Sequence, residues 1–112
     1  IEFKVEAVAS AKVGGFGPWH TFQGPGAQSD MIRALQPDMV VNAIAGIHGL
    51  EPSVTALQTQ AELVMGCKEA IVAAGPLLKK IASSHKARII PADSEHVAAL
   101  ELLKHAGDVK RL

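Results

Sequence analysis

The amino-acid sequence predicts an α/β fold built on a parallel β-sheet. Short apolar segments that suit buried strands alternate with longer segments of helical periodicity, and this alternation is typical of βαβ units. The segment at 38–46 is apolar along nearly its whole length, as expected for a strand of a parallel sheet that helices cover on both faces. We therefore expect strands and helices to alternate from residue 38 to the end of the chain.

The first third of the chain carries weaker signals. Residues 2–9 alternate between apolar and charged side chains, which predicts a strand near a sheet edge. Residues 14–26 hold five glycines and two prolines, which indicates a loop, with room for an edge strand around 19–22. Residues 27–36 place apolar side chains at helical spacing and predict a short amphipathic helix.

The remaining segments follow the strand and helix rules in turn. After the strand at 38–46, Pro52 suits the first turn of a helix. Gly75 and Pro76 predict a break in the long helix, and Gly107 predicts a helix stop. The expected order is a helix at 51–60, a strand at 61–66, a helix at 68–85, a strand at 87–92, a helix at 94–107 and the start of a further strand at 108–112.

Composition excludes several classes of protein. With 112 residues, the chain is one domain at most, or a piece of a larger one. Eleven basic residues balance eleven acidic ones, and aromatic residues make up 4%, so no nucleic-acid partner is expected. The sequence has no run of 18 consecutive apolar residues, so no membrane span is expected. The single cysteine, Cys67, excludes an internal disulfide and a zinc site with several thiolates.

Polar side chains cluster where the last complete predicted strand ends. In an extended stretch, Asp93 and Glu95 would point the same way, and two carboxylates suit Mg²⁺ or Mn²⁺. The alternative is a helix start, with Asp93 or Ser94 as the cap and Glu95 in the first turn. On these residues alone, the helix start is the commoner outcome.

Two other strand ends are candidate sites. Lys68 lies at a predicted helix start, where a cation is unfavourable unless an anion binds nearby; the alternative is a solvated pair of Lys68 with Glu69. The small residues at 43–46 and the G-x-x-G turn after them would let a ligand approach the backbone. A complete G-x-G-x-x-G nucleotide motif is missing.

Taken together, three motifs resemble the 1-deoxy-D-xylulose 5-phosphate reductoisomerase family. VVNAIAGIHGLEPSVTAL, GCKEAIVAAGPLL and IIPADSEHVAAL occur in this order and resemble the family's A-I-x-G-x-x-G-L turn, its A-N-K-E-S-L-V segment and its P-V-D-S-E-H motif. The opening FKVEAVASAKV resembles the family's second strand. The resemblance covers most of residues 3–112 and is weakest at 14–30.

The resemblance implies an incomplete Rossmann-like fold that lacks the family's first strand and glycine-rich loop. Residues 1–92 would belong to an NADP-binding domain, and residues 93–112 would begin the catalytic domain. The family converts deoxyxylulose phosphate, a phosphorylated sugar, to methylerythritol phosphate for isoprenoid synthesis. It uses NADPH with Mg²⁺ or Mn²⁺, and works as a homodimer in the bacterial cytoplasm or a plastid-type organelle.

The resemblance also implies a role for individual residues. The implied metal ligands are Asp93 and Glu95; the substrate-binding residues are Lys68, Ser94 and Glu95, with Lys68 also catalytic; and the cofactor-binding residues are Lys12, Ala43, Ile44, Ala45, Cys67 and Glu69.

The chain departs from the family pattern at two places in the second motif. Cys67 stands where the family has Asn, and Ala70 stands where it has Ser, which puts a cofactor hydrogen bond in doubt. Two alternatives therefore stay open: a divergent NAD(P)-dependent oxidoreductase with another substrate, or a non-catalytic α/β binding module. In either enzyme reading, the segment alone is expected to be inactive.

Overall fold

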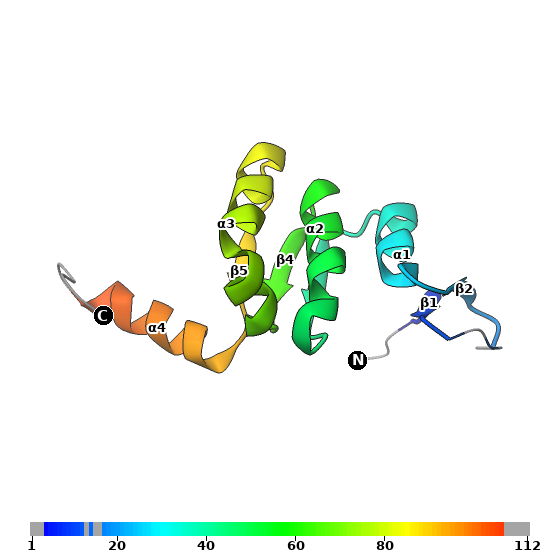
Figure 1. Ribbon diagram of the computed structural model, residues 1–112, viewed down its shortest axis with the longest axis horizontal. Coiled ribbons are helices and arrows are strands. Elements are labelled where there is room, and N and C mark those ends of the chain that lie inside the picture. The colour runs from blue at the N-terminus through cyan, green and yellow to red at the C-terminus, as the bar shows by residue number, and fades with distance from the viewer. Residues whose placement is uncertain (1–3, 13, 15–16, 107–112) are drawn as a thin grey trace.

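The computed structural model of the chain describes residues 4–12, 14 and 17–106, and it shows parallel strands alternating with helices (Figure 1). The prediction of an α/β fold with parallel strands flanked by helices is confirmed. The elements are β1 (Ala7–Ser10), β2 (His20–Gln23), α1 (Ala27–Leu35), β3 (Met39–Asn42), the 3₁₀ helix η1 (Gly46–Gly49), α2 (Leu50–Gln58), β4 (Glu62–Met65), α3 (Lys68–His85), β5 (Ile89–Pro91) and α4 (Ser94–His105).

The described strands form two separate parallel sheets. One contains β1 and β2, and the other has the order β3-β4-β5. The edge strand expected around 19–22 is thus present as β2. The prediction of a strand at 2–9 is wrong for residues 4–6, because β1 begins only at Ala7, where the four residues of β2 pair with it. Residues 2 and 3 lie outside the described part.

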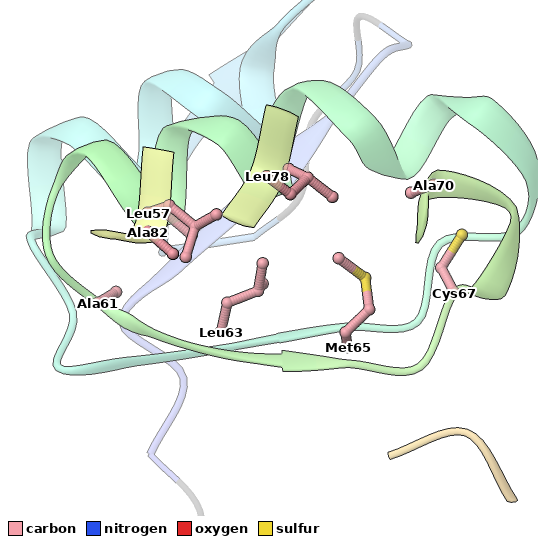
Figure 2. Packing of buried hydrophobic residues seen from close by; sticks show 9 residues of the cluster. Leu57, Ala61, Leu63, Met65, Cys67, Ala70, Leu78 and Ala82 are labelled. Atoms are coloured by element: carbon pink, nitrogen blue, oxygen red, sulfur yellow. The ribbon is translucent and has the colours of Figure 1, made fainter. Parts of the chain in front are cut away.

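The core lies between the second sheet and the helices α2 and α3. Because side chains alternate along a strand, Leu63 and Met65 of β4 both face these helices and are fully buried. They pack against Leu57 of α2 and Leu78 of α3 (Figure 2). Val40 of β3 packs against the same cluster. This burial fixes the register of the sheet, because a shift by one residue would expose both β4 side chains.

The strand predicted at 38–46 is shorter than expected. The ladder of β3 ends at Asn42, because the Asn42 side chain accepts a hydrogen bond from the Ile44 N–H, and residues 43–45 leave the sheet. The long helix predicted at 68–85 is confirmed with the same bounds, as α3. Its expected break is present, since Ala74 has non-helical angles (φ −144°, ψ 23°) just before Gly75 and Pro76.

The last helix, α4, extends away from the rest of the molecule (Figure 1). None of its residues is buried, and Leu102 is 72% exposed. The helix ends at His105, whereas Gly107 and the strand expected at 108–112 lie outside the described residues. Across the described part of the chain, no helix combines the length and the apolar character that crossing a membrane requires.

Candidate functional site

The carboxyl ends of three parallel strands meet at one edge of the second sheet. The Gly66 N–H donates to the Asn42 carbonyl at 2.8 Å, which ties the last residue of β3 to the end of β4. The candidate residues at 43–45 follow β3 directly, and those at 67–69 and 93–95 begin two residues after the ends of β4 and β5. In open parallel sheets, ligands bind at this edge.

An ion pair connects two of these strand ends. The Lys68 ammonium donates to Glu95 Oε1 at 2.9 Å, although the two residues are 27 positions apart in the sequence. The Ser94 hydroxyl donates to the other carboxylate oxygen, Oε2, at 2.8 Å. Both charged side chains are more than half exposed, so the pair is open to solvent and to a ligand. The structure therefore brings together Lys68, Ser94 and Glu95.

The ion pair shifts the pKa of both partners. The hydrogen bond from Lys68, followed by that from Ser94, lowers the pKa of Glu95. The hydrogen bond to Glu95 and the nearby charges of Glu95 and Asp93 raise the pKa of Lys68. Consequently, Lys68 is a fixed cation at neutral pH, and Glu95 is a fixed anion.

Asp93 lies beside this pair and caps α4. Its Oδ1 accepts the Glu95 N–H at 3.2 Å and lies 3.3 Å from His96 Nδ1. Asp93 is extended and Glu95 is already in the first helical turn, so the helix-start alternative, with Asp93 as the cap, is confirmed, and the alternative of one extended stretch is wrong. The cap brings the Glu95 backbone N–H to the Asp93 carboxylate.

The ion pair can be tested through the pKa of Glu95. In the variant Lys68→Met, the pKa of Glu95 should rise towards the usual glutamate value, because its main stabilising partner is removed. The stabilisation that the fold gains from the lowered pKa of Glu95 is present above the ordinary glutamate pKa and is lost as the pH falls. The stabilisation that it gains from the raised pKa of Lys68 is lost as the pH rises through that pKa. Both side chains are therefore charged and paired between about pH 5 and pH 10.

The measurement is a carboxyl-carbon NMR titration of wild type and variant. Glu101 is the internal control, because it pairs with Lys104 on the same helix and should titrate alike in both proteins. An unchanged Glu95 titration would contradict the ion pair in solution.

A buried amide holds the turn that follows β3. The Asn42 side chain is 2% exposed, and its Nδ2 donates to the Gly49 carbonyl and to Ser53 Oγ, each at 2.7 Å. Its Oδ1 accepts the Ile44 N–H at 3.0 Å, and the Ser53 hydroxyl donates to Gly49 O. Sequence analysis did not single out Asn42. The available signal was one amide within an apolar run, since a buried amide requires partners.

Two glycines shape the same turn. Gly46 has φ +73°, which favours glycine, and the space where a Cβ would lie is open. A Cβ at Gly49 would lie 3.0 Å from the Ile44 carbonyl oxygen and 3.2 Å from Asn42 Nδ2. The turn at 43–49 therefore needs both glycines, one for its conformation and one for its close packing.

Cys67 joins the ends of β3 and β4. Its thiol lies 3.2 Å from the Gly46 carbonyl and 3.3 Å from Glu69 Oε2, and the residue is 2% exposed. Hydrogen bonds from its own backbone amide and from this thiol lower the pKa of Glu69. Ala70 is fully buried in the core, so it does not line the strand-end site.

Lys12 is the candidate residue that lies next to the other sheet. It follows β1, and its backbone N–H donates to Ser10 Oγ at 3.1 Å. Its neighbour Ala11 lines one cavity together with Ile44, which follows β3. Thus, the end of the first sheet faces the small-residue turn across a cavity. In the described part of the chain, no group of three or more His, Cys, Asp or Glu side chains is placed to hold a metal ion.

Comparison with known proteins identifies similar sequences over most of the chain. The sequence model for 1-deoxy-D-xylulose 5-phosphate reductoisomerase matches residues 4–75. The reductoisomerase of Rhodococcus jostii (strain RHA1) is 41% identical over 91 residues, which are 80% of this chain and 22% of the relative. That of Paenarthrobacter aurescens (strain TC1) is 41% identical over 102 residues, which are 91% of this chain and 25% of the relative. A match of that length necessarily takes in residues 93–96.

Solved structures give the same result for the fold. A crystal structure of DOX-P reductoisomerase in complex with NADPH, fosmidomycin and magnesium has a TM-score of 0.65 and 33% identity, covering 70% of this chain and 19% of that one. The enzyme from Zymomonas mobilis in complex with NADPH has a TM-score of 0.64 and 27% identity, covering 70% and 20%. The chain therefore spans about a fifth to a quarter of the length of these relatives.

Proposed function

This chain belongs to the 1-deoxy-D-xylulose 5-phosphate reductoisomerase family, and from that premise we propose that it is a segment of an NADPH- and divalent-metal-dependent enzyme. The reaction would convert 1-deoxy-D-xylulose 5-phosphate to 2-C-methyl-D-erythritol 4-phosphate in isoprenoid biosynthesis. The observation that carries this proposal is the contact between Lys68 and Glu95, with Asp93 beside it. It joins the K-E and D-S-E-H motifs at one sheet edge.

The donor set at this edge suits a hard divalent cation. Asp93 and Glu95 supply two carboxylates from the start of α4, one on each side of Ser94, and Mg²⁺ often takes only one or two carboxylates from a protein. We assign Asp93 and Glu95 as metal ligands and Ser94 as a substrate contact. The metal ion, when bound, would polarise the substrate carbonyl and stabilise negative charge on its oxygen.

Lys68 is assigned an electrostatic role towards the substrate. Because the pKa of Lys68 is raised, its ammonium stays protonated at neutral pH, which suits an electrostatic role. A fixed cation beside the substrate would instead stabilise an oxygen that becomes negative during the rearrangement. The ion pair holds the ammonium beside the Glu95 carboxylate, which supports this assignment.

The cofactor is assigned to the neighbouring strand ends. Ala43, Ile44 and Ala45 would line the nicotinamide side, because the small side chains of the two alanines and the open space at Gly46 allow close approach to the backbone. Further cofactor contacts are assigned at the β4 end and beyond β1: Cys67, Glu69 and Lys12. The positive charge of Lys12 suits the additional phosphate of NADPH.

The division of the chain into domains is part of the proposal. Residues 1–92 would form part of the NADP-binding domain, and residues 93–112 would begin the catalytic domain. The exposed position of α4 supports this boundary, because none of its residues is buried. A homodimer, in the bacterial cytoplasm or a plastid-type organelle, is proposed from the family resemblance alone.

The proposed reaction can be tested directly on the complete protein. With NADPH, Mn²⁺ and deoxyxylulose phosphate, nicotinamide absorbance should fall in proportion to enzyme, and chelation of the metal should stop the reaction. The 112-residue chain alone serves as a control and should show no turnover. A complete, folded protein that binds NADPH but does not oxidise it with this substrate would overturn the substrate assignment.

A second candidate function follows from Cys67. Because its thiol contacts Gly46 and Glu69, it takes the place of an amide that the family resemblance leads one to expect near the cofactor. A divergent NAD(P)-dependent oxidoreductase with another substrate is therefore the alternative. Oxidation of NADPH with a different hydroxyketone phosphate, in preference to deoxyxylulose phosphate, would favour it.

Cys67 itself can be probed by graded substitution in the complete protein. We expect Cys67→Ala to raise KM for NADPH several-fold, because Glu69 loses the thiol contact that fixes its carboxylate. Cys67→Ser keeps a donor of similar size and should leave KM within about twofold of wild type. Equal KM values for the alanine and serine variants would show that the thiol contact makes no contribution to NADPH binding.

A further inference from the structure

Both oxygens of the Glu95 carboxylate accept a hydrogen bond from this chain. The Lys68 ammonium donates to Oε1 at 2.9 Å, and the Ser94 hydroxyl donates to Oε2 at 2.8 Å. The two donors differ in kind, because the hydroxyl is neutral and belongs to the neighbouring residue, whereas the ammonium is a full cation from the start of another helix. One of the two proposed metal ligands thus carries a cation of the chain itself.

The register of the second sheet determines where this cation lies. Met65 of β4 pairs with Pro91 of β5, and the Ala92 N–H donates to the Met65 carbonyl at 2.9 Å. These contacts hold the ends of β4 and β5 side by side, so that Lys68, the first residue of α3, reaches the first turn of α4. The ion pair is therefore a consequence of the fold and not of neighbouring positions in the sequence.

Two other carboxylates lie near Lys68, but they have other contacts. The Glu69 Oε2 lies 3.3 Å from the Cys67 thiol, and the Asp93 Oδ1 accepts the Glu95 N–H at 3.2 Å. Within the part of the chain that the structure describes, Lys68 forms its ion pair with Glu95 alone. The ammonium thus lies on a proposed metal ligand and not on the acid next to it in the sequence.

The contact between Lys68 and Glu95 can open without a change in the fold. The two side chains are 53% and 64% exposed. Exposed ion pairs contribute little to stability, and the flexible lysine stem lets the ammonium move while the backbone stays in place. The ammonium can therefore leave the carboxylate for another partner.

A divalent cation at this site needs the same carboxylate. Mg²⁺ and Mn²⁺ take carboxylate oxygens as ligands, and two cations at one carboxylate repel each other. By thermodynamic linkage, a contact that weakens metal binding is itself weakened by the bound metal ion. The Lys68 contact should therefore lower the affinity of the site for a divalent cation.

We propose that the Lys68 ammonium is an internal counterion of the Glu95 carboxylate, and that it leaves this carboxylate when a divalent cation binds. The released ammonium is then free to contact an oxygen of the substrate. Because the two cations compete for one carboxylate, Lys68 becomes available to the substrate only at a site that holds its metal ion. This inference rests on the assignment of Asp93 and Glu95 as metal ligands in the proposed function.

Mn²⁺ binding to the complete protein, without substrate or NADPH, tests the proposal. Electron paramagnetic resonance measures free Mn²⁺ during the titration, so no activity is needed. Lys68→Met should lower the Kd for Mn²⁺ by about fivefold, the factor that corresponds to one exposed ion pair. Lys68→Arg keeps the positive charge, so its Kd should be no lower than that of wild type. An unchanged or higher Kd in Lys68→Met would overturn the proposal.

Two further variants separate the proposal from the metal assignment. Lys104→Met removes the same charge from the ion pair with Glu101 farther along α4, and its Kd should stay within about twofold of wild type. Equal tightening by Lys104→Met and Lys68→Met would indicate an effect of net charge and overturn the proposal.

Asp93→Asn keeps a good helix cap but removes a proposed ligand charge, so it should weaken Mn²⁺ binding at least about tenfold. If Asp93→Asn leaves the Kd unchanged, the metal assignment fails and the proposal fails with it. If Asp93→Asn weakens binding while Lys68→Met does not tighten it, the proposal alone fails.

The movement of Lys68 can be observed directly by proton–nitrogen NMR of the lysine ammonium groups in the complete protein. The Lys68 signal, identified by its loss in Lys68→Arg, should shift or disappear as Mg²⁺ saturates the site, because a released ammonium exchanges its protons with water. The Lys104 signal should stay, because its partner Glu101 is not assigned to the metal. A Lys68 signal that persists unshifted at Mg²⁺ saturation would overturn the proposal.

Discussion

Replacing Glu95 by glutamine in the complete protein is expected to lower kcat/KM for deoxyxylulose phosphate by more than about 100-fold. Removal of an outer partner of a metal ligand typically costs about 10–100-fold, and a larger loss is expected here because Glu95 is assigned as a ligand itself. Glutamine keeps the size of the side chain but removes the negative charge that attracts both the metal ion and Lys68. The measurement is steady-state kinetics over a range of Mn²⁺ concentrations, with Mn²⁺ affinity measured separately by electron paramagnetic resonance.

Glu101→Gln provides a matched control for this substitution. Glu101 lies on the same helix and also forms an ion pair, with Lys104, but it is far from the strand ends. Its replacement should change neither kcat/KM nor Mn²⁺ affinity by more than about twofold, because exposed ion pairs contribute little. If the Glu95 and Glu101 variants behaved alike, Glu95 could not be a metal ligand.

Replacing Asn42 by leucine is expected to destabilise the fold by about 2–4 kcal/mol. The loss follows because the Ile44 N–H and the Ser53 hydroxyl lose a partner inside the protein, and each unsatisfied buried group costs about 1–3 kcal/mol. Leucine has a similar volume, so the effect isolates the hydrogen bonds from the loss of packing. Urea-induced unfolding measures the change in the free energy of unfolding.

Ser53→Ala should be the milder change at the same turn, at about 1 kcal/mol, since Asn42 still donates to the Gly49 carbonyl. Gln58→Leu is the surface control, because Gln58 is exposed at the end of α2 and should change stability by less than about 0.5 kcal/mol. A leucine variant as stable as wild type would show that the Asn42 network does not hold the turn.

The element types in this fold could be predicted from local patterns. Helical spacing and apolar runs placed the described α-helices and the strands β3, β4 and β5 near their observed positions, and Gly75 with Pro76 located the kink in α3, whereas the 3₁₀ helix η1 was not predicted. Element lengths were less predictable. The strand at 38–46 looked continuous, and it ends at Asn42 because a side chain replaces a backbone partner, which no apolar pattern can reveal.

The candidate site was predictable only in part. The predicted parallel topology placed Lys68 and the D-S-E-H motif at the ends of strands, so the two were expected to be neighbours. The direct contact of Lys68 with Glu95 joins positions far apart in sequence, so it depends on β4 pairing with β5 in register. The sequence alone could not decide whether Asp93 caps α4 or binds a metal ion, because an acidic residue suits both roles.

The kink in α3 gives the helix two mechanically different parts. At Ala74 the backbone leaves the helical conformation, and Pro76 cannot donate the hydrogen bond that would stiffen the junction. The longer C-terminal part is fixed by Leu78 and Ala82 in the core, whereas the short part that carries Lys68 and Glu69 is held by fewer buried residues. The junction can therefore act as a pivot, so that the start of α3 adjusts to a ligand while the core keeps its packing.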